Sequence, residues 1–288
     1  MPLFLMAGGL FFCVRSTGFS IDKISSNLSY NEVWETPPLT QREQEHLLQE
    51  VLSQTYYYLA SGNQCYAFIS EDRQYVLKFF KMQNLFPKSW IKGLPLSLLR
   101  RLRFVNEEDN LLFSERIFAS YKDAYESLSE QTGLLYIHFN KTRDLRSKVS
   151  LIDNKGKKYL LDLDRVEFVV QRRAQKIFEY LGDLHRGQKY DELKTAISSF
   201  LKLIAIRCER GFADQDLKIR NNFGYIGNSA VQIDCATLTR DSSMKYPLNF
   251  RQEVMHVTEH LNMWARDYCP ELTLYIQEEA QRIINNSL

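Results

Sequence analysis

Residues 212–236, FADQDLKIRNNFGYIGNSAVQIDCA, contain the side chains best suited to chemistry. Asp216 and Asn221 lie close together in this stretch, and Asp234 ends an apolar run. Side-chain oxygens of Asn and Asp suit a hard cation such as Mg²⁺, which keeps waters and takes substrate phosphates. A further carboxylate can accept the proton of an attacking hydroxyl group. We therefore predict that Asn221 and Asp234 hold Mg²⁺ and that Asp216 orients or deprotonates an acceptor hydroxyl.

The elements around this stretch place those three side chains on a loop and a hairpin. Helical periodicity covers 175–211 and ends at Gly211, as expected for a helix C-terminus. The runs FGYIG and AVQID are joined by a turn at Gly227 and Asn228, which predicts a two-stranded hairpin. Beyond Asp234 only helical patterns follow.

The first half of the chain reads as β-rich. Thr40 and Glu43 form a capping box that predicts a helix start. Residues 55–81 alternate as three short antiparallel strands, and small residues around Gly62 lie at the first turn, where a backbone can approach a ligand. A long helix is expected from about 106 to 128, followed by further strands up to about 172.

Four segments resemble protein-kinase motifs, in the same order. DQDLKIRN resembles the catalytic loop H-R-D-L-x-x-x-N with Asp216 and Asn221 at its Asp and Asn, and IDCA resembles D-F-G with Asp234 first. LASGNQCYAF resembles the Gly-rich loop through Gly62, and YVLKFFK resembles the V-A-I-K strand through Lys78. The resemblance covers roughly residues 55–240.

This resemblance implies an α+β, bilobal protein-kinase-like fold with an antiparallel β-sheet N-lobe and a mainly helical C-lobe. The N-terminal arm and capping helix would occupy 1–54, the first lobe 55–170 and the second lobe 171–288. ATP would lie with its phosphates at the Gly62 turn and Lys78, with Lys81 as the alternative lysine. A helix glutamate would pair with Lys78.

The first choice for that glutamate is Glu115, with Glu126 in reserve. The motifs also depart from the kinase pattern. Asp214 replaces the loop His, only Gly62 remains of three glycines, and Cys235 and Ala236 follow the metal-binding Asp. No A-P-E motif is present and the tail is short. These departures favour an atypical bacterial kinase with a small-molecule or protein acceptor.

Two other functions stay open. The same departures fit a pseudokinase that binds nucleotide or a protein partner without transferring phosphate. The segment HVTEH at 256–260 has the H-x-x-E-H form of inverted zincins, which would use His256, His260 and a third ligand for zinc. Carboxylates that could serve as that third ligand are Glu271, Glu278 and Glu279.

Composition limits the remaining classes. The chain has 288 residues and a net charge of +2, so no overall basic field points to nucleic acid. Five irregularly spaced cysteines support neither a disulfide framework nor a zinc ribbon, and indicate a cytoplasmic setting, the chain's own or a host's. Residues 1–14 are apolar but lack a preceding basic residue, so their role stays open between a signal and a packed tail. The basic, amphipathic segment 81–105 predicts at most a weak membrane-surface contact.

Overall fold

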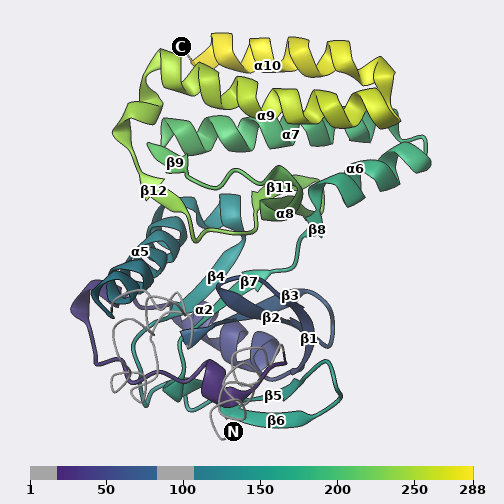
Figure 1. Ribbon diagram of the computed structural model, residues 1–288. Helices are drawn as coiled ribbons and strands as arrows, with labels where there is room; N and C mark the ends of the chain where they lie inside the picture. Colours follow the sequence, from purple (N-terminus) through teal and green to yellow (C-terminus); the bar gives the residue numbers. More distant parts are fainter. Residues whose placement is uncertain (1–17, 83–106, 288) are drawn as a thin grey trace, which may run out of the picture.

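The structure, a computed structural model, describes residues 18–82 and 107–287. It is a mixed α+β protein in which a large sheet lies at one end and a layered set of helices at the other (Figure 1). The apolar segment at the N-terminus and all but the first two residues of the basic segment 81–105 lie outside the described residues. No helix in the described part has the length and apolar character needed to cross a bilayer.

Within the described residues the large sheet has seven strands, in the order β4-β7-β3-β2-β1-β5-β6. All neighbours are antiparallel except β1 and β5, which run parallel. The three antiparallel strands predicted for 55–81 are confirmed as β1, β2 and β3. The strands are β1 (Thr55–Ser61), β2 (Cys65–Ser70), β3 (Tyr75–Phe80), β4 (Leu134–His138), β5 (Lys148–Ile152), β6 (Lys158–Asp162) and β7 (Phe168–Arg172).

Strand β3 is buried on both faces because the two sides of the sheet are covered by different parts of the chain. Leu77 and Phe79 pack with the N-terminal arm and with aromatic residues such as Phe68. Phe80 points the other way and packs against helix α5 (Glu107–Thr132), where it contacts Phe118 with ring centroids 5.1 Å apart. Since side chains alternate along a strand, Lys78 belongs to the same face as Phe80.

The N-terminal arm reaches the sheet through a short helix, α2 (Gln41–His46). The predicted capping box is confirmed: the Thr40 hydroxyl accepts from the Glu43 N–H at 3.3 Å, and the Glu43 carboxylate accepts from the Thr40 N–H at 2.8 Å. Earlier in the arm, Trp34 packs edge-on against Phe118, with ring centroids 5.1 Å apart. The arm therefore braces the helix that covers the site-bearing face of the sheet.

The C-terminal part is built on helices that lie side by side, with α7, α9 and α10 in layers (Figure 1). The elements are β8 (Gln175–Lys176), α6 (Ile177–Arg186), α7 (Tyr190–Glu209), β9 (Phe212–Asp214), α8 (Ile219–Asn222), β10 (Phe223–Ile226), β11 (Ser229–Gln232), β12 (Leu238–Arg240), α9 (Pro247–Tyr268) and α10 (Thr273–Ser287). The predicted hairpin is confirmed as β10–β11, turning at Gly227 with φ of 59°.

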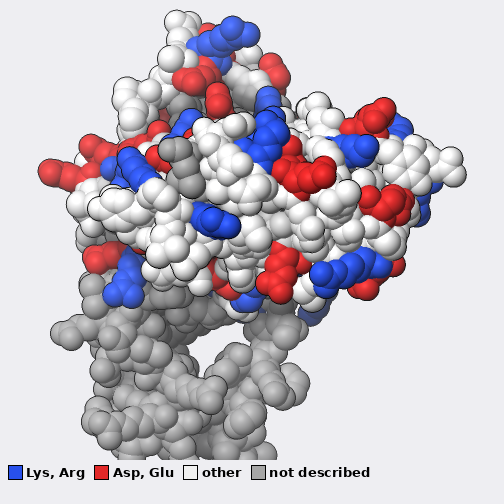
Figure 2. Space-filling model, turned by 90° about the horizontal axis from the view of Figure 1, so that it is seen from above, with Lys and Arg blue, Asp and Glu red and all other residues white. Residues whose placement is uncertain are grey.

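Apolar residues from α7, α9 and α10 make one continuous core. Fully buried members include Ile197, Phe200 and Ile204 of α7, Val254, Val257 and Leu261 of α9, and Ile276 of α10. The outer face of these helices carries interspersed acidic and basic side chains, seen from above in Figure 2. That face therefore presents no extended field of one sign.

Gly224 lies where β10 pairs with β8, and the strands approach too closely for a side chain. A Cβ there would overlap the Gln175 carbonyl oxygen and lie 2.9 Å from Ile233 Cδ1. We expect Gly224→Ala to lower the free energy of unfolding by about 2 kcal/mol, measured by urea denaturation. Gly62→Ala is the control, since its Cβ would meet nothing closer than the Cys65 carbonyl oxygen at 3.9 Å. Equal stability of the two variants would contradict this packing.

Candidate functional site

The loop that carries Asp216 is anchored by a buried carboxylate two residues earlier. The Asp214 side chain is fully buried. Its Oδ1 accepts from the Thr237 hydroxyl at 2.7 Å and from the Asp216 N–H at 3.0 Å. Its Oδ2 accepts from Gln232 Nε2 at 2.8 Å and lies 3.7 Å from Arg207 Nη1. One carboxylate thus joins the loop to both sides of the Asp234 segment.

The cation beside Asp214 is as deeply buried as the carboxylate. Arg207 on α7 is 1% exposed, and its Nη1 also donates to Gln232 Oε1 at 3.2 Å. Its Nη2 forms an ion pair with Glu253 on α9. A buried charge requires such compensation because its transfer from water is unfavourable. From the sequence, Asp214 is only the residue that stands where the kinase pattern has His, and its anchoring role was not predicted.

Asp216 itself points outward. Its carboxylate is 40% exposed and forms a 2.8 Å ion pair with Lys218, which is 62% exposed. The hydrogen bond and charge of Asp216 raise the pKa of Lys218, and the Asp234 carboxylate adds to this effect. Lys218 therefore lies in the fields of both carboxylates that the sequence singled out. Asp216 is accessible to a ligand, as a group that receives a proton must be.

The two asparagines of the loop differ in their surroundings. Asn221 is exposed and lines a pocket between α6 and α9, with Phe178 and Trp264 among its walls. Asn222 is 5% exposed, and its Nδ2 donates to the Asp216 carbonyl oxygen at 2.7 Å. The Asn222 carbonyl oxygen accepts from the N–H of Ile233 at 2.6 Å. Asn222, which was not among the predicted metal ligands, therefore lies between the loop and the Asp234 segment.

Asp234 follows β11 and is half-buried. One of its carboxylate oxygens, Oδ1, accepts from the Ala236 N–H at 3.1 Å. Its backbone N–H lies 3.4 Å from the Asn222 carbonyl oxygen, and its own carbonyl accepts from Gln232 Nε2 at 3.1 Å. No described residue forms a hydrogen bond or an ion pair with the second carboxylate oxygen, Oδ2. Asp234 can thus offer an oxygen to a cation.

Helix α5 holds the chain just after Asp234. The Ser120 hydroxyl donates to the carbonyl oxygens of Cys235 and Leu238, the latter at 2.5 Å. Cys235, Ala236 and Leu238 also pack in the core that contains Phe118 of the same helix. A displacement of α5 would therefore move the Asp234 segment with it.

Lys78 reaches the same segment from the sheet. It is 8% exposed, and its Nζ donates to the Ile233 carbonyl oxygen at 2.5 Å. The same carbonyl accepts from Gln171 Nε2 at 3.2 Å, and the Tyr121 ring centroid lies 5.9 Å from Nζ. Among the residues described, no carboxylate forms an ion pair with Lys78. An ammonium group has three donors, and here one carbonyl and one aromatic face meet it.

Charge effects on two thiols place Lys78 and Asp234 in one neighbourhood. Burial raises the pKa of Cys65 to about 12, while the Lys78 ammonium lowers it and the Asp234 carboxylate raises it. Burial also raises the pKa of Cys235, with the same opposing contributions from Lys78 and Asp234. Burial is the largest cause of the raised pKa of Tyr121, and the Asp234 carboxylate is the second. The thiols and the phenol are therefore neutral at pH 7, and the shared influence of Lys78 and Asp234 on both thiols places these two side chains in one neighbourhood.

Gly62 lies in the turn between β1 and β2, as predicted, where its N–H donates to the Cys65 carbonyl oxygen at 3.0 Å. Lys81, the alternative phosphate lysine, donates to the Gly62 carbonyl oxygen and lies 4.8 Å from the Tyr66 ring centroid. The two lysines thus serve different segments, Lys81 the turn and Lys78 the chain before Asp234.

The structure does not bring either predicted glutamate to Lys78. Glu115 is half-buried on α5 and forms no ion pair with Lys78, while Glu126 pairs with Lys122 at 3.7 Å. Tyr121 of α5 is the residue that faces the ammonium. The pairing of Glu115 with Lys78 stays a prediction.

The histidines of HVTEH lie on the surface of α9. His256 and His260 are exposed, with ring centroids 5.1 Å apart. Among residues 18–82 and 107–287, neither of them belongs to a group of three metal-ligating side chains within reach of one ion. The structure therefore supplies no third ligand for the zinc-protease hypothesis from these residues.

No protein-family model and no curated protein matches this chain. Among solved structures, the bifunctional kinase-methyltransferase WbdD is similar to it at a TM-score of 0.36 and 15% identity, over 67% of this chain and 34% of WbdD. A second WbdD structure gives a TM-score of 0.39 and 14% identity, over 78% and 45%. The chain thus spans less than half the length of these proteins. Similarity this low does not narrow the fold class beyond the mixed α+β architecture described above.

The anchoring role of Asp214 can be tested by stability measurements. We expect Asp214→Ala to lower the free energy of unfolding by about 3–5 kcal/mol, because Arg207 loses one of its two acidic partners. The variant also leaves the Thr237 hydroxyl and the Gln232 amide without their acceptor. Asp216→Ala removes an exposed carboxylate and should change it by no more than about 0.5 kcal/mol. Urea unfolding of both variants checks this. A stable Asp214→Ala protein would show that the buried carboxylate is not the anchor.

Proposed function

We propose that this protein is an ATP- and Mg²⁺-dependent phosphotransferase with a bilobal, atypical kinase-like fold. The observation that carries the proposal is the buried Lys78 ammonium, which meets the carbonyl next to Asp234 and no described carboxylate. A buried cation with unused donors is a place for an anion. A phosphate group there would receive charge-assisted hydrogen bonds from Nζ.

Two side-chain oxygens, one on Asp234 and one on Asn222, would hold the magnesium ion in this proposal. Asp234 offers a carboxylate oxygen that no described residue occupies, and Asn222 has its amide nitrogen engaged with Asp216, which leaves its amide oxygen for a cation. Mg²⁺ prefers such oxygens together with water and phosphate. When bound, it would neutralise charge on the transferring phosphoryl group. Asn221, the ligand predicted from the sequence, lies on the exposed side of the loop.

Asp216 would receive or orient the hydroxyl of the acceptor. It is exposed beside Lys218, and its backbone is fixed by Asp214 and Asn222. A carboxylate held in this way can accept a proton without a change in the fold. The acceptor class stays open between a small molecule and a protein, and nucleotide binding would involve the Gly62 turn, where Lys81 already contacts the backbone.

A second function, nucleotide binding without transfer, is favoured by one observation. Tyr121 faces Lys78 where the kinase resemblance implies a helix glutamate, so the ammonium lacks the partner that would orient it. A pseudokinase of this kind would bind ATP and leave acceptors unmodified. The variants below separate the two functions.

We expect Asp234→Ala to abolish Mg²⁺-dependent ATP binding and to leave the fold intact, because it removes the only carboxylate proposed to hold the ion. Asp216→Asn should keep binding within about threefold and lower phosphate transfer or autophosphorylation by about 10²–10⁴-fold. Calorimetric titration and a radiolabelled transfer assay measure the two effects. If Asp216→Asn transfers phosphate at the wild-type rate, Asp216 has no catalytic role. ATP binding by the wild type with no transfer to any acceptor would support the pseudokinase.

The two asparagines provide a matched pair. We expect Asn222→Ala to weaken Mg²⁺-dependent ATP binding by about tenfold or more, since its amide lies between Asp216 and the Asp234 segment. Asn221→Ala should bind as the wild type does, because Asn221 lines the pocket between α6 and α9. Circular dichroism controls for folding of each variant. The reverse order of effects would restore Asn221 as the metal ligand.

A further inference from the structure

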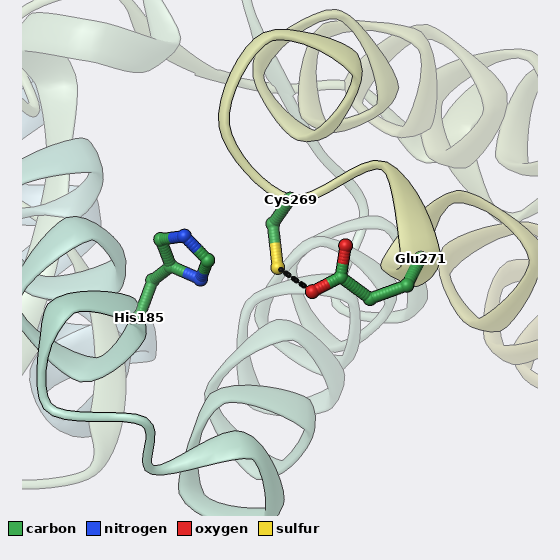
Figure 3. A group of neighbouring side chains, drawn as sticks. All are labelled: His185, Cys269 and Glu271. Atoms are coloured by element: carbon green, nitrogen blue, oxygen red, sulfur yellow. Dashed lines mark hydrogen bonds between the residues drawn. The ribbon is translucent and has the colours of Figure 1, made fainter.

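Three side chains of metal-ligating type lie together where the end of α6 meets the junction of α9 and α10 (Figure 3). His185 lies in the last turn of α6, and Cys269 follows the end of α9. Glu271 belongs to the single 3-10 turn Pro270–Leu272 that leads into α10. Figure 3 shows the His185 imidazole opposite the Cys269 thiol, which points toward the Glu271 carboxylate.

The distances among these groups are close to those of a metal site. One ring nitrogen of His185, Cys269 Sγ and a carboxylate oxygen of Glu271 all lie within 4.8 Å of one another. Sγ is 3.2 Å from Oε1 of Glu271. Zinc bonds of about 2.3 Å to sulfur and about 2.0 Å to oxygen at a tetrahedral angle separate S and O by about 3.5 Å. The thiol and the carboxylate therefore already lie near this separation, and rotation of the His185 side chain would bring its nitrogen to the same ion.

An unsatisfied buried atom points to a missing partner. His185 Nδ1 is buried and has no hydrogen-bond partner among the described residues. A buried polar atom left without a partner costs free energy, so such atoms usually have a ligand, a water or an ion. The other two groups already contact each other, since the Cys269 thiol donates to Glu271. The imidazole is the group that a bound ion would satisfy.

We propose that His185, Cys269 and Glu271 form a zinc site, with water in the fourth position. One nitrogen, one sulfur and one carboxylate oxygen are ligands that zinc takes, whereas Mg²⁺ and Ca²⁺ prefer oxygen alone. Binding replaces the S–H bond of Cys269 by an S–Zn bond, and the released proton goes to solvent. Glu271 is the exposed member of the group, so the ion and its water would enter beside its carboxylate.

Such a site would join the end of α6 to the junction of α9 and α10. Cys269 and Leu272 are buried in the core of these helices, while Leu184, next to His185, packs in the same core. The ion would therefore stabilise the helical part, and it involves none of the residues proposed for phosphate transfer. Loss of zinc binding would leave phosphate transfer in place, and loss of phosphate transfer would leave zinc binding in place, so each can be tested separately.

The test is a titration of the full-length reduced protein with Co²⁺, whose tetrahedral complexes with a thiolate absorb strongly. We expect one ion per chain, with a thiolate-to-cobalt charge-transfer band that Zn²⁺ displaces, and a higher melting temperature with Zn²⁺. Cys269→Ser should remove the band, and His185→Gln and Glu271→Gln should each weaken binding by about tenfold or more. Circular dichroism confirms that each variant is folded.

The double variant His256→Gln/His260→Gln is the matched control, since it removes the exposed histidine pair of α9 and leaves this group intact. It should bind Co²⁺ as the wild type does. If Cys269→Ser does not fold, zinc-edge X-ray absorption of the wild type decides: one sulfur among nitrogen and oxygen ligands is expected. A shell without sulfur, a band that survives Cys269→Ser, or no band at all would overturn the proposal.

Discussion

The structure depends on the buried charge cluster of Asp214, Arg207 and Glu253. Transfer of an aspartate and an arginine from water into a protein interior is unfavourable unless each finds partners in one particular arrangement. Asp214 finds them in Thr237, Gln232 and Arg207, which belong to three different segments. Any arrangement that separated these segments would leave a charge buried alone. The cluster therefore specifies how the loop, the hairpin and α7 fit together.

A second set of polar contacts joins the sheet to the helices. Lys78 and Gln171 both donate to the Ile233 carbonyl from the sheet side, and Ser120 donates to two carbonyls just beyond Asp234 from α5. The chain around Asp234 is thus held from both directions. A ligand that binds between Lys78 and Asp234 would contact groups from the sheet and from the helical part at once. Its affinity would therefore depend on how these two parts are placed relative to each other.

Local patterns in the sequence predicted the local structure well. The alternating runs of 55–81, the Thr40 capping box and the Gly227 turn each carry their cause within a few residues, and all three are confirmed. The fold class was correct at the level of mixed α+β. The two-lobe arrangement and the roles of Lys78, Asp216 and Asp234 remain predictions.

The features that the sequence could not predict arise from contacts distant along the chain. In the sequence, Asp214 is only a departure from the kinase catalytic-loop pattern. Its structural role becomes visible when Arg207 and Gln232 are seen to contact it. Asn221 and Asn222 are the same residue type at adjacent positions, so the sequence does not distinguish them. The conformation of α8 buries the side chain of Asn222. Glu115 lacks a motif, and the face of α5 that meets Lys78 is decided by packing around Phe118. His185, Cys269 and Glu271 come together only because α6 ends beside the α9–α10 junction.

The proposed function requires that Lys78 binds a nucleotide phosphate beside the Asp234 segment. Calorimetric titration of the full chain with ATP, with and without Mg²⁺, tests it most directly when the Lys78→Met protein is measured in parallel. Methionine keeps the length and apolar stem of the side chain and removes the charge, so the fold should persist. We expect Mg²⁺-dependent binding by the wild type and an ATP affinity that is lower by about tenfold or more in the variant. Equal ATP affinity of the two folded proteins would contradict it.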